Sequence, residues 1–538
     1  MSTEESPVLI VGGGLVGLSA AMFLAQHGVG SIVAERLRNT SVLPRAAYFH
    51  LRTLELFRSA GIEEQVRHQS AREFTPEGAI VALESLAGKQ IAAFVPSLNE
   101  GVEALSPCRR LFITQPGLEP ILRARAVAAG AKFLDGWELA GFAEDRDGVT
   151  ATVKDTGSGS ERRLRVRYLI GADGPRSRTR DLLGIPCDGR GTFSNSLTIY
   201  FRADVARLMA GRNLSVMYII NPTLSGFVRL DKESRSGFLA VNTVGDPSKP
   251  EAGNAAADTS EKRVLELVRS AIGDPDIAVE IEGVARWRAV SDVARRYREG
   301  RVFLAGDAAH VMPPTGGFGG NTGIHDAHNL AWKLAWVLKG AAGQELLSSY
   351  EEERRPVGKL TVEQAYTRYV TRTAPHLGAQ DFEPQAAESN VELGYLYHSG
   401  AILPEAPTSA LHEDPSQSLG RPGSRAPHLW LDRGGRRIST LDLFGSSFVL
   451  LAGPRGDAWR SASREAAGAL AGLDLDAYVV GTDLLDAAER FTPSYGLSAS
   501  GAALVRPDGF VAWRSRDGAA NPAESLKRAL VQILSRTA

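Results

Sequence analysis

The chain of 538 residues has few cysteines, almost no net charge and no apolar run long enough to cross a membrane. Its two cysteines, Cys108 and Cys187, exclude a disulfide framework and argue against a cysteine-based metal site or a CxxC redox pair, so we expect no metal. The formal net charge of −1 gives no reason to expect nucleic acid or a membrane surface as a partner. The short acidic start lacks the basic region of a signal peptide, and we therefore expect a cytoplasmic protein.

The composition that remains is typical of a globular protein, with 43% hydrophobic and 23% charged residues. A chain of this length exceeds one ordinary hydrophobic core, so we expect two to three domains. Proline-containing stretches at residues 375–387 and 404–427 indicate linkers.

The N-terminal region carries a βαβ nucleotide-binding pattern. A short apolar strand runs into the glycine motif Gly12–Gly17, a helical pattern follows, and a second strand ends on Glu35. Gly12 permits a tight turn, Gly14 lets the backbone approach a pyrophosphate, and Gly17 lets the helix pack on the strand. Glu35 stands where a carboxylate would bond a ribose hydroxyl. Together these features predict a dinucleotide site rather than an unrelated glycine-rich turn.

Two further predicted strands end on an acid beside a glycine, at Asp173-Gly174 and at Gly306-Asp307. Ligands of open α/β sheets bind at the carboxyl ends of the strands, so these two motifs and Gly12–Gly17 are consistent with one shared site.

A Pro/Gly loop at residues 313–320 follows Asp307, and apolar spacings of three and four predict a long helix from about Asn321 to Gly340. Glycine lets the backbone of such a loop approach a flat ligand closely. The N-terminus of the helix favours negative charge. The stretch therefore indicates a planar, partly anionic ligand.

Residues 194–244 alternate and are rich in β-branched and aromatic side chains, which predicts an antiparallel sheet. Residues 75–107 are polar and irregular and are interpreted as part of a second domain that also contains this sheet. The order of elements in residues 439–534 predicts a small α/β domain at the end of the chain. Side chains of the sheet that could line an apolar pocket, or equally form ordinary core, are Tyr200, Met217, Tyr218, Phe227, Arg229 and Phe238.

In this order along the chain, the motifs resemble the fingerprints of the FAD-dependent aromatic hydroxylases, the group A flavoprotein monooxygenases. Pro313–Gly317, Asn321–Gly323 and Asp326–Leu330 are similar to the phenol hydroxylase and polyketide hydroxylase branch. That branch has a C-terminal thioredoxin-like domain without redox cysteines, and this chain has no CxxC there.

The resemblance implies an α/β fold in which a Rossmann-like FAD-binding domain carries an inserted α+β substrate domain with an antiparallel sheet. The implied limits are residues 1–75, 108–185 and 286–370 for the FAD-binding domain, 76–107 and 186–285 for the substrate domain, 371–425 for a linker region and 426–538 for the thioredoxin-like domain.

The resemblance also implies roles for residues at matching positions. Arg45 and Pro314 would be the catalytic residues beside the flavin ring. His325 departs from the family, which usually has Gln there, and His310 is interpreted as a structural hydrogen-bonding residue. The implied FAD-binding residues are Gly12, Gly14, Leu15, Val16, Gly17, Glu35, Arg36, Arg45, Gln115, Asp173, Gly174, Gly306, Asp307, Pro314, Gly317, Gly319, Gly320, Asn321 and Thr322.

The implied activity is hydroxylation of a phenolic or polycyclic, polyketide-like aromatic compound in secondary metabolism such as antibiotic biosynthesis. NADPH or NADH would reduce FAD, O₂ would form a flavin C4a-hydroperoxide, and its distal oxygen would pass to a ring carbon. The chain has no second GxGxxG, so we expect NAD(P)H to bind transiently, without a domain of its own.

Three alternatives remain beside hydroxylation. One is Baeyer–Villiger oxygen insertion into a polyketide by the same fold, and another is a flavin-binding protein without turnover. A flavin-dependent halogenase is disfavoured because its Trp-x-Trp-x-Ile-Pro motif is absent. The sequence is compatible with a homodimer and does not choose between NADPH and NADH.

Overall fold

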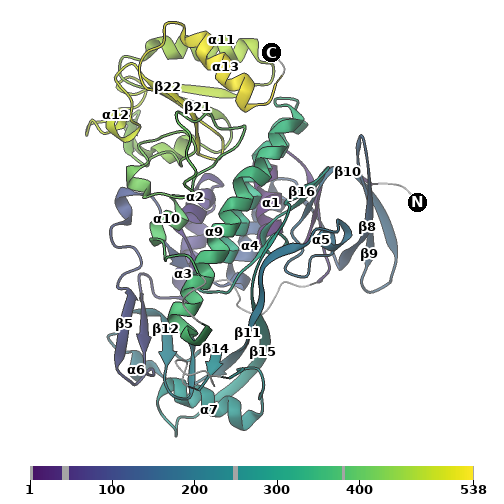
Figure 1. Cartoon of the computed structure of the whole chain (residues 1–538), viewed down its shortest axis with the longest axis vertical. Coiled ribbons are helices and arrows are strands. Elements are labelled where there is room, and N and C mark those ends of the chain that lie inside the picture. The colour runs from purple at the N-terminus through teal and green to yellow at the C-terminus, as the bar shows by residue number, and fades with distance from the viewer. Residues whose placement is uncertain (1–3, 39–47, 246–252, 378–381, 537–538) are drawn as a thin grey trace.

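The computed structural model describes residues 4–38, 48–245, 253–377 and 382–536. Arg45 lies outside the described residues. Figure 1 shows a C-terminal α/β unit at the top, a sheet covered by helix α7 at the bottom, and the N-terminal sheet between them. None of the described helices is long and apolar enough to cross a membrane.

The N-terminal sheet has the strand order β16-β17-β10-β1-β2-β7, in which the strands from β17 to β7 are parallel and β16 is antiparallel to β17. Strands β9 and β8 continue from β10 as antiparallel neighbours. Apolar runs in β1 and β2 are buried, as expected for parallel strands that are covered on both faces. The strands are β1 (Glu4–Val11), β2 (Ser31–Glu35), β7 (Lys132–Asp135), β8 (Trp137–Asp145), β9 (Gly148–Asp155), β10 (Glu161–Gly171), β16 (Arg298–Glu299) and β17 (Val302–Leu304).

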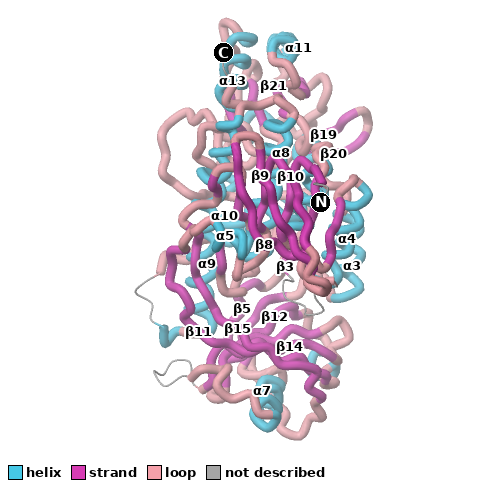
Figure 2. The backbone as a smooth tube through the Cα atoms, turned by 90° about the vertical axis from the view of Figure 1, so that its right-hand side faces the viewer, coloured by secondary structure: helices cyan, strands magenta, loops and turns pink. Residues whose placement is uncertain are grey.

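Helices cover one face of this sheet, and the curled β8-β9-β10 extension, seen face-on in Figure 2, covers part of the other. The covering helices are α1 (Leu15–Gln26), α4 (Gln115–Ala128) and α8 (Phe318–Leu338). The start of α8 was expected near Asn321, about one turn later. The pair Gly319-Gly320 weakens the helical pattern, but Gly317 ends the loop with φ +70° and the helix begins at once.

The second sheet has the order β18-β15-β11-β14-β13-β12-β4-β5. Residues 75–107 were expected to be irregular but contain β4 and β5. Strand β4 pairs in parallel with β12, more than 130 residues later, which local patterns do not reveal. The strands are β4 (Ala79–Leu83), β5 (Gln90–Val95), β11 (Cys187–Arg202), β12 (Leu214–Ile220), β13 (Leu224–Leu230), β14 (Ser236–Val244), β15 (Glu280–Ala294) and β18 (His310–Val311).

Alternation gives this second sheet two different faces. Helix α7 (Glu261–Ile272) packs on one face over a core that includes Met217, Ile219 and Leu239. The opposite face carries Tyr218 and Phe227, which contact the rest of the molecule. The predicted domain limit at residues 285–286 falls inside β15, which runs without a break from the second sheet toward the first.

The C-terminal unit is a four-stranded sheet, β22-β21-β23-β24, with helices α11 (Asp457–Ala469) and α13 (Pro522–Ile533). Trp332 and Trp336 of α8 make edge contacts with Phe448 of β21, at 5.9 and 5.0 Å between ring centroids. The strands are β21 (Phe448–Ala452), β22 (Leu475–Val479), β23 (Ala502–Val505) and β24 (Val511–Ser515).

The remaining elements connect these units. They are β3 (Tyr48–Phe49), β6 (Leu111–Phe112), β19 (Trp430–Arg433), β20 (Arg436–Ser439), α2 (Leu51–Ser59), α3 (Glu63–Glu73), α5 (Arg178–Leu182), α6 (Ala206–Met209), α9 (Ser348–Thr373), α10 (Glu388–Glu392) and α12 (Phe491–Ser494).

Candidate functional site

The motifs found in the sequence meet at the carboxyl edge of the N-terminal sheet. Gly12 follows β1, Glu35 ends β2, Asp173 comes shortly after β10, and Gly306 comes shortly after β17. These four strands are parallel neighbours, so their ends lie side by side. The shared edge expected from the sequence is therefore present.

Glycines let the elements at this edge come into backbone contact. A Cβ on Gly17 would lie 1.9 Å from the Gly12 carbonyl oxygen, so α1 can pack on the turn only with glycine there. A Cβ on Gly306 or on Gly323 would lie 2.6 or 2.5 Å from Cγ2 of Val16. Val16 thus marks the point where α1, α8 and the Gly306-Asp307 turn meet, and no larger residue fits at the two glycines.

Among the described residues, no N-cap side chain satisfies the backbone donors at the N-terminus of α1. Its N-cap is Gly14, which provides no side-chain cap, and its first turn has no acidic residue. The Glu35 carboxylate accepts hydrogen bonds from the backbone N–H of Gly13 (2.6 Å) and of Leu37 (2.8 Å) and keeps further lone pairs free. Free N–H groups suit a pyrophosphate and a carboxylate suits ribose hydroxyls, so this edge fits a dinucleotide such as FAD.

Two of the other expected cofactor residues lie near this end of α1. The Gln115 side chain donates to Glu119 (2.6 Å), and a Cβ on Gly14 would lie 3.8 Å from the same Glu119 oxygen. Leu15 is buried in the first turn of α1. Arg36 is exposed just after β2.

Asp173 uses both carboxylate oxygens within its own loop. It accepts hydrogen bonds from the Ser177 hydroxyl (2.5 Å) and from the N–H and hydroxyl of Thr179 (both 2.9 Å). Gly174 beside it has φ +81° and open space around it. The loop is joined to the Gly306 turn by Arg180, which donates to the Ala308 carbonyl (3.0 Å). The Asp173 carboxylate therefore stabilises the conformation of this loop.

A buried carboxylate, Asp326 of α8, holds the Gly306-Asp307 turn in place. It accepts hydrogen bonds from Gly306 N–H (3.0 Å), His310 Nε2 (2.7 Å) and Arg354 Nε (2.7 Å). Burial alone would raise the pKa of Asp326, but the charge of Arg354 and the bond from His310 hold it below its usual value. His310 is thus a structural hydrogen-bonding residue, as expected from the sequence.

Asn321 fastens the start of α8 to the segment that follows the undescribed residues 39–47. Its amide donates to the carbonyls of Tyr48 (2.9 Å) and Gly317 (2.7 Å). Its Oδ1 accepts from His50 N–H (3.0 Å) and from the Thr53 hydroxyl (2.6 Å).

The neighbours of Asn321 on α8 are also buried. The Thr322 carbonyl accepts from Arg354 (3.1 Å). His325 Nε2 lies 3.0 Å from the Thr53 hydroxyl, and burial lowers its pKa well below the usual value, so the ring is neutral. The departure from the family at this position therefore changes one buried polar contact.

One cavity of about 1110 Å³ lies between the second sheet and the Pro/Gly loop at residues 313–320, which we call the glycine loop. One wall consists of Asp307, Pro313, Pro314, Gly316, Gly317, Gly319 and Gly320. The opposite wall includes five of the six expected pocket residues, Tyr200, Tyr218, Phe227, Arg229 and Phe238. The sixth, Met217, is only 1% exposed and lies in the core on the α7 side. Neighbouring residues of a strand point to opposite faces, so Met217 cannot share a wall with Tyr218.

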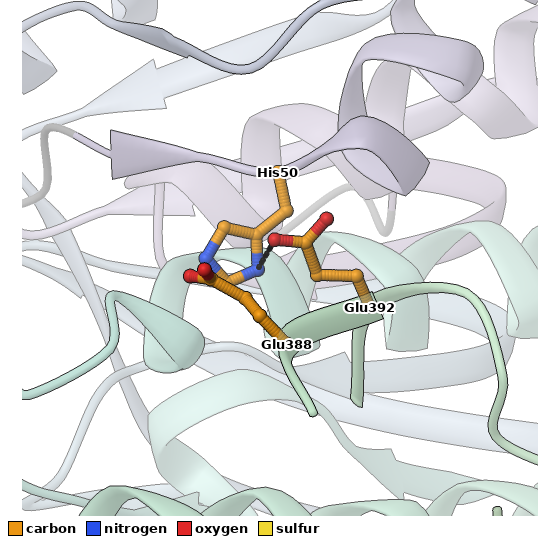
Figure 3. A group of neighbouring side chains, drawn as sticks. All are labelled: His50, Glu388 and Glu392. Atoms are coloured by element: carbon orange, nitrogen blue, oxygen red, sulfur yellow. Dashed lines mark ion pairs between the residues drawn. The ribbon is translucent and has the colours of Figure 1, made fainter. Parts of the chain in front are cut away.

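Three side chains behind the loop form the group in Figure 3. His50, Glu388 and Glu392 place possible ligand atoms within 4.8 Å of one another, a spacing that could hold a metal ion. However, Arg110 donates to both oxygens of Glu392 (2.9 and 3.0 Å), so a cation would have to displace a guanidinium.

His50 connects this group of three side chains to the glycine loop. Its Nε2 donates to the Gly316 carbonyl (2.9 Å), and burial lowers the pKa of His50 to about 4. Burial also raises the pKa of Glu392 to about 7, despite the opposing effect of Arg110. Tyr48 lies against Gly317 and donates to Glu388 at 3.4 Å. Sequence reasoning missed these residues because they come from distant segments.

Comparison with known proteins gives matches along nearly the whole chain. The FAD binding domain family matches residues 5–365, and the family described as aromatic-ring hydroxylase, C-terminal, matches residues 420–537. A 4-methyl-5-nitrocatechol 5-monooxygenase of Burkholderia sp is 52% identical, over 99% of this chain and 98% of its own.

Two further matches have a tetracenomycin or aklavinone in their names. A tetracenomycin A2 monooxygenase-dioxygenase of Streptomyces glaucescens is 42% identical over 100% of this chain and 98% of its own. The crystal structure of aklavinone-11 hydroxylase with FAD and aklavinone superposes with a TM-score of 0.93 at 38% identity, and the match covers 100% of both chains.

Proposed function

The chain belongs to the FAD-binding aromatic-ring hydroxylases, and from this premise we propose that it hydroxylates a one-ring catechol or phenol that carries an electron-withdrawing substituent. The matches confirm the expected mixed α/β fold, the FAD dependence and the monooxygenase activity. The choice of a one-ring substrate is supported by the 52% identity to a nitrocatechol monooxygenase, against 42% to a relative that acts on a tetracenomycin.

We assign the FAD-holding role to the carboxyl edge of the N-terminal sheet. The free N–H groups at the start of α1 would bind the pyrophosphate, Glu35 would accept from the adenosine ribose, and Asp307 would lie along the ribityl chain. Bound FAD, with NAD(P)H and O₂, supplies the oxygen chemistry. Pro314 and the glycines of the loop would lie beside the flavin ring.

The protein's own contribution is to hold a flat substrate against that ring and away from water. The observation that carries this proposal is that a single cavity has the glycine loop as one wall and the aromatic face of the second sheet as the other. The Phe227 ring contacts both Tyr218 and Phe238, with centroids 5.9 and 5.8 Å apart. Such a wall packs against an aromatic ring and excludes water from the reacting atoms.

The loop must keep its shape while substrates enter and leave. Asn321 holds its end through Tyr48 and Gly317, His50 holds the Gly316 carbonyl, and Asp326 holds the Gly306 turn. A position fixed by several hydrogen bonds needs little reorganisation in the reaction, which is how enzymes orient reactants.

The test is oxidation of NADPH and of NADH by the purified, FAD-containing protein. The compounds added are 4-nitrocatechol, 4-methylcatechol and a tricyclic hydroxyanthraquinone, under ¹⁸O₂. We expect 4-nitrocatechol to stimulate oxidation more strongly than 4-methylcatechol, which lacks an electron-withdrawing substituent, and the product to contain one labelled oxygen with its ring intact. Stimulation by the tricyclic compound alone would overturn the one-ring proposal. Release of only H₂O₂ with all three compounds, or protein purified without FAD, would overturn the hydroxylation of such rings altogether.

A further inference from the structure

Arg229 of β13 is a buried cation that forms no ion pair with any described residue. Its side chain is 5% exposed, and neither Nε nor Nη2 has a hydrogen-bond partner among the described residues. The acid with the largest electrostatic effect on it is Glu73. The Glu73 carboxylate accepts instead from Gln69 (2.8 Å) and from Thr114 N–H (2.6 Å). A guanidinium in this state lacks the partner that buried charges normally have.

Other cations that line the cavity are in a different state. Arg176, Arg286 and Arg288 are exposed to solvent, and Arg180 donates to the carbonyls of Ala308 and Pro175. Arg372 is half-buried, with its Cζ 4.8 Å from the ring centroid of Phe94. Water or protein oxygens therefore satisfy the first four groups, and Arg372 keeps contact with solvent. Among the described lining residues, Arg229 is the buried cation whose donors remain unused.

Two aromatic rings hold the guanidinium of Arg229 in position. Its Cζ lies 4.3 Å from the ring centroid of Phe74 and 4.4 Å from that of Phe112. Contact with ring faces partly replaces the lost solvation of a cation, and it lowers the rotational freedom of the side chain. The same burial lowers the pKa of Arg229 to about 9, so it stays charged at neutral pH.

The rings also relate Arg229 to the glycine loop. Phe112 stacks on Tyr48, with centroids 4.9 Å apart and planes inclined by 21°. Tyr48 in turn lies against Gly317, where an added Cβ would come within 2.9 Å of its ring. The cation is therefore fixed, through two stacked rings, relative to the loop beside which the flavin ring would lie.

We propose that Arg229 binds an anionic oxygen of the substrate, so that the enzyme selects catechols and phenols that are ionised or carry a nitro or carboxylate group. The inference rests on the proposed function and names the chemical feature that the cavity recognises. A planar guanidinium donates two parallel hydrogen bonds to a carboxylate, a nitro group or a delocalised phenolate. Nε and Nη2 are both shielded by neighbouring side chains, so such a group would approach the end of the guanidinium that lines the cavity and supply the negative charge that Arg229 lacks.

The test measures binding of two ligands to the FAD-containing protein, from the change in flavin absorbance. At neutral pH 4-nitrocatechol is ionised because of its nitro group, whereas 4-methylcatechol of similar size is neutral. The variant Arg229→Met keeps the apolar stem and removes the charge. We expect it to bind 4-nitrocatechol about 100-fold more weakly and 4-methylcatechol within about threefold of the unchanged protein.

Thermal unfolding without ligand separates recognition from packing. Replacing an unpaired buried cation by an apolar side chain removes a desolvation cost, so Arg229→Met should unfold at the same temperature as the unchanged protein or higher. Arg229→Lys keeps the charge but loses the fork of donors, and we expect an intermediate loss for 4-nitrocatechol. Arg202→Gln, an exposed change on β11, is the matched control and should alter neither affinity.

Two results would overturn the proposal. One is an equal loss for both ligands with a lowered unfolding temperature, which would make Arg229 a packing residue. The other is an unchanged affinity of Arg229→Met for 4-nitrocatechol. If Arg229→Met does not fold, Arg229→Lys and the preference of the unchanged protein for the ionised ligand decide the question. Failure of the proposed function differs, because the unchanged protein would then hydroxylate neither catechol.

Discussion

Replacing Asp326 by asparagine should loosen the Gly306-Asp307 turn without changing the size of any side chain. The Asp326 carboxylate is fully buried and accepts from Gly306 N–H, His310 Nε2 and Arg354 Nε. An amide keeps one acceptor oxygen and turns an NH₂ toward the other partners. Arg354 has no acceptor to offer, so the oxygen will remain on its side and the NH₂ will face Gly306 N–H, which loses its bond.

The size of the effect follows from these contacts. Arg354 is fully buried and would lose its only charged partner among the described residues, although it keeps the Thr322 carbonyl and the Tyr397 hydroxyl. Breaking a buried ion pair costs about 3–5 kcal/mol, and the two remaining bonds favour the lower value, about 3 kcal/mol. Loss of the bond to Gly306 should weaken FAD binding about fivefold, the equivalent of about 1 kcal/mol.

The assay is urea unfolding followed by circular dichroism at several FAD concentrations. Bound FAD itself stabilises the folded protein, so the concentration series separates the two effects. Asp188→Asn is the control, because Asp188 forms an exposed ion pair with Arg295 and should contribute less than about 1 kcal/mol. If Asp326→Asn unfolds within 1 kcal/mol of the unchanged protein and binds FAD equally well, the role given to Asp326 is wrong.

Three further predictions concern other parts of the site. Because burial raises the folded-state pKa of Glu392 to about 7, the free energy of unfolding should fall by about 3 kcal/mol between pH 4.5 and pH 7, and urea unfolding of Glu392→Gln should lack this slope. Gly17→Ala would place a Cβ 1.9 Å from the Gly12 oxygen, so the purified variant should lack the visible absorbance of bound FAD. The control Gly468→Ala, in the exposed part of α11, should keep FAD and raise the free energy of unfolding in urea by up to about 1 kcal/mol. Glu353 accepts from Lys333 (2.7 Å) and Arg506 (2.5 Å) in the buried interface with the C-terminal unit. Glu353→Gln should therefore lower the free energy of unfolding by about 3 kcal/mol and speed proteolysis of the C-terminal unit. Unchanged proteolysis would contradict this.

The parts of the site that the sequence predicted are those set by short, local patterns. A glycine motif after an apolar strand dictates a turn wherever the strand lies, and parallel strands bring Gly12, Asp173 and Asp307 to one edge. Strict alternation would also have removed Met217 from the expected pocket, since Tyr218 beside it faces the cavity. That signal was available in the sequence.

Other parts depend on contacts that no local pattern reveals. The charged run at residues 351–355 is typical of an exposed helix face, yet Glu353 is 1% and Arg354 is 0% exposed. Their partners, among them Asp326 and Arg506, lie far away in the sequence. The unpaired state of Arg229 likewise becomes visible only once Phe74 and Phe112 are folded around it. The buried charged residues in and around the site are thus harder to predict from the sequence than the glycine motifs that form its backbone.

The C-terminal unit illustrates how such distant contacts reach the site. Among the described residues, none after Glu388 lines the cavity. The unit instead holds the helices that lead to it: Arg425 donates to Glu55 of α2 (2.5 and 2.9 Å), and Arg506 donates to Glu353 of α9. Helix α2 begins directly after His50, and α9 carries the Arg354 that fixes Asp326. A charge removed from this interface should therefore affect the glycine loop through the positions of α2 and α9.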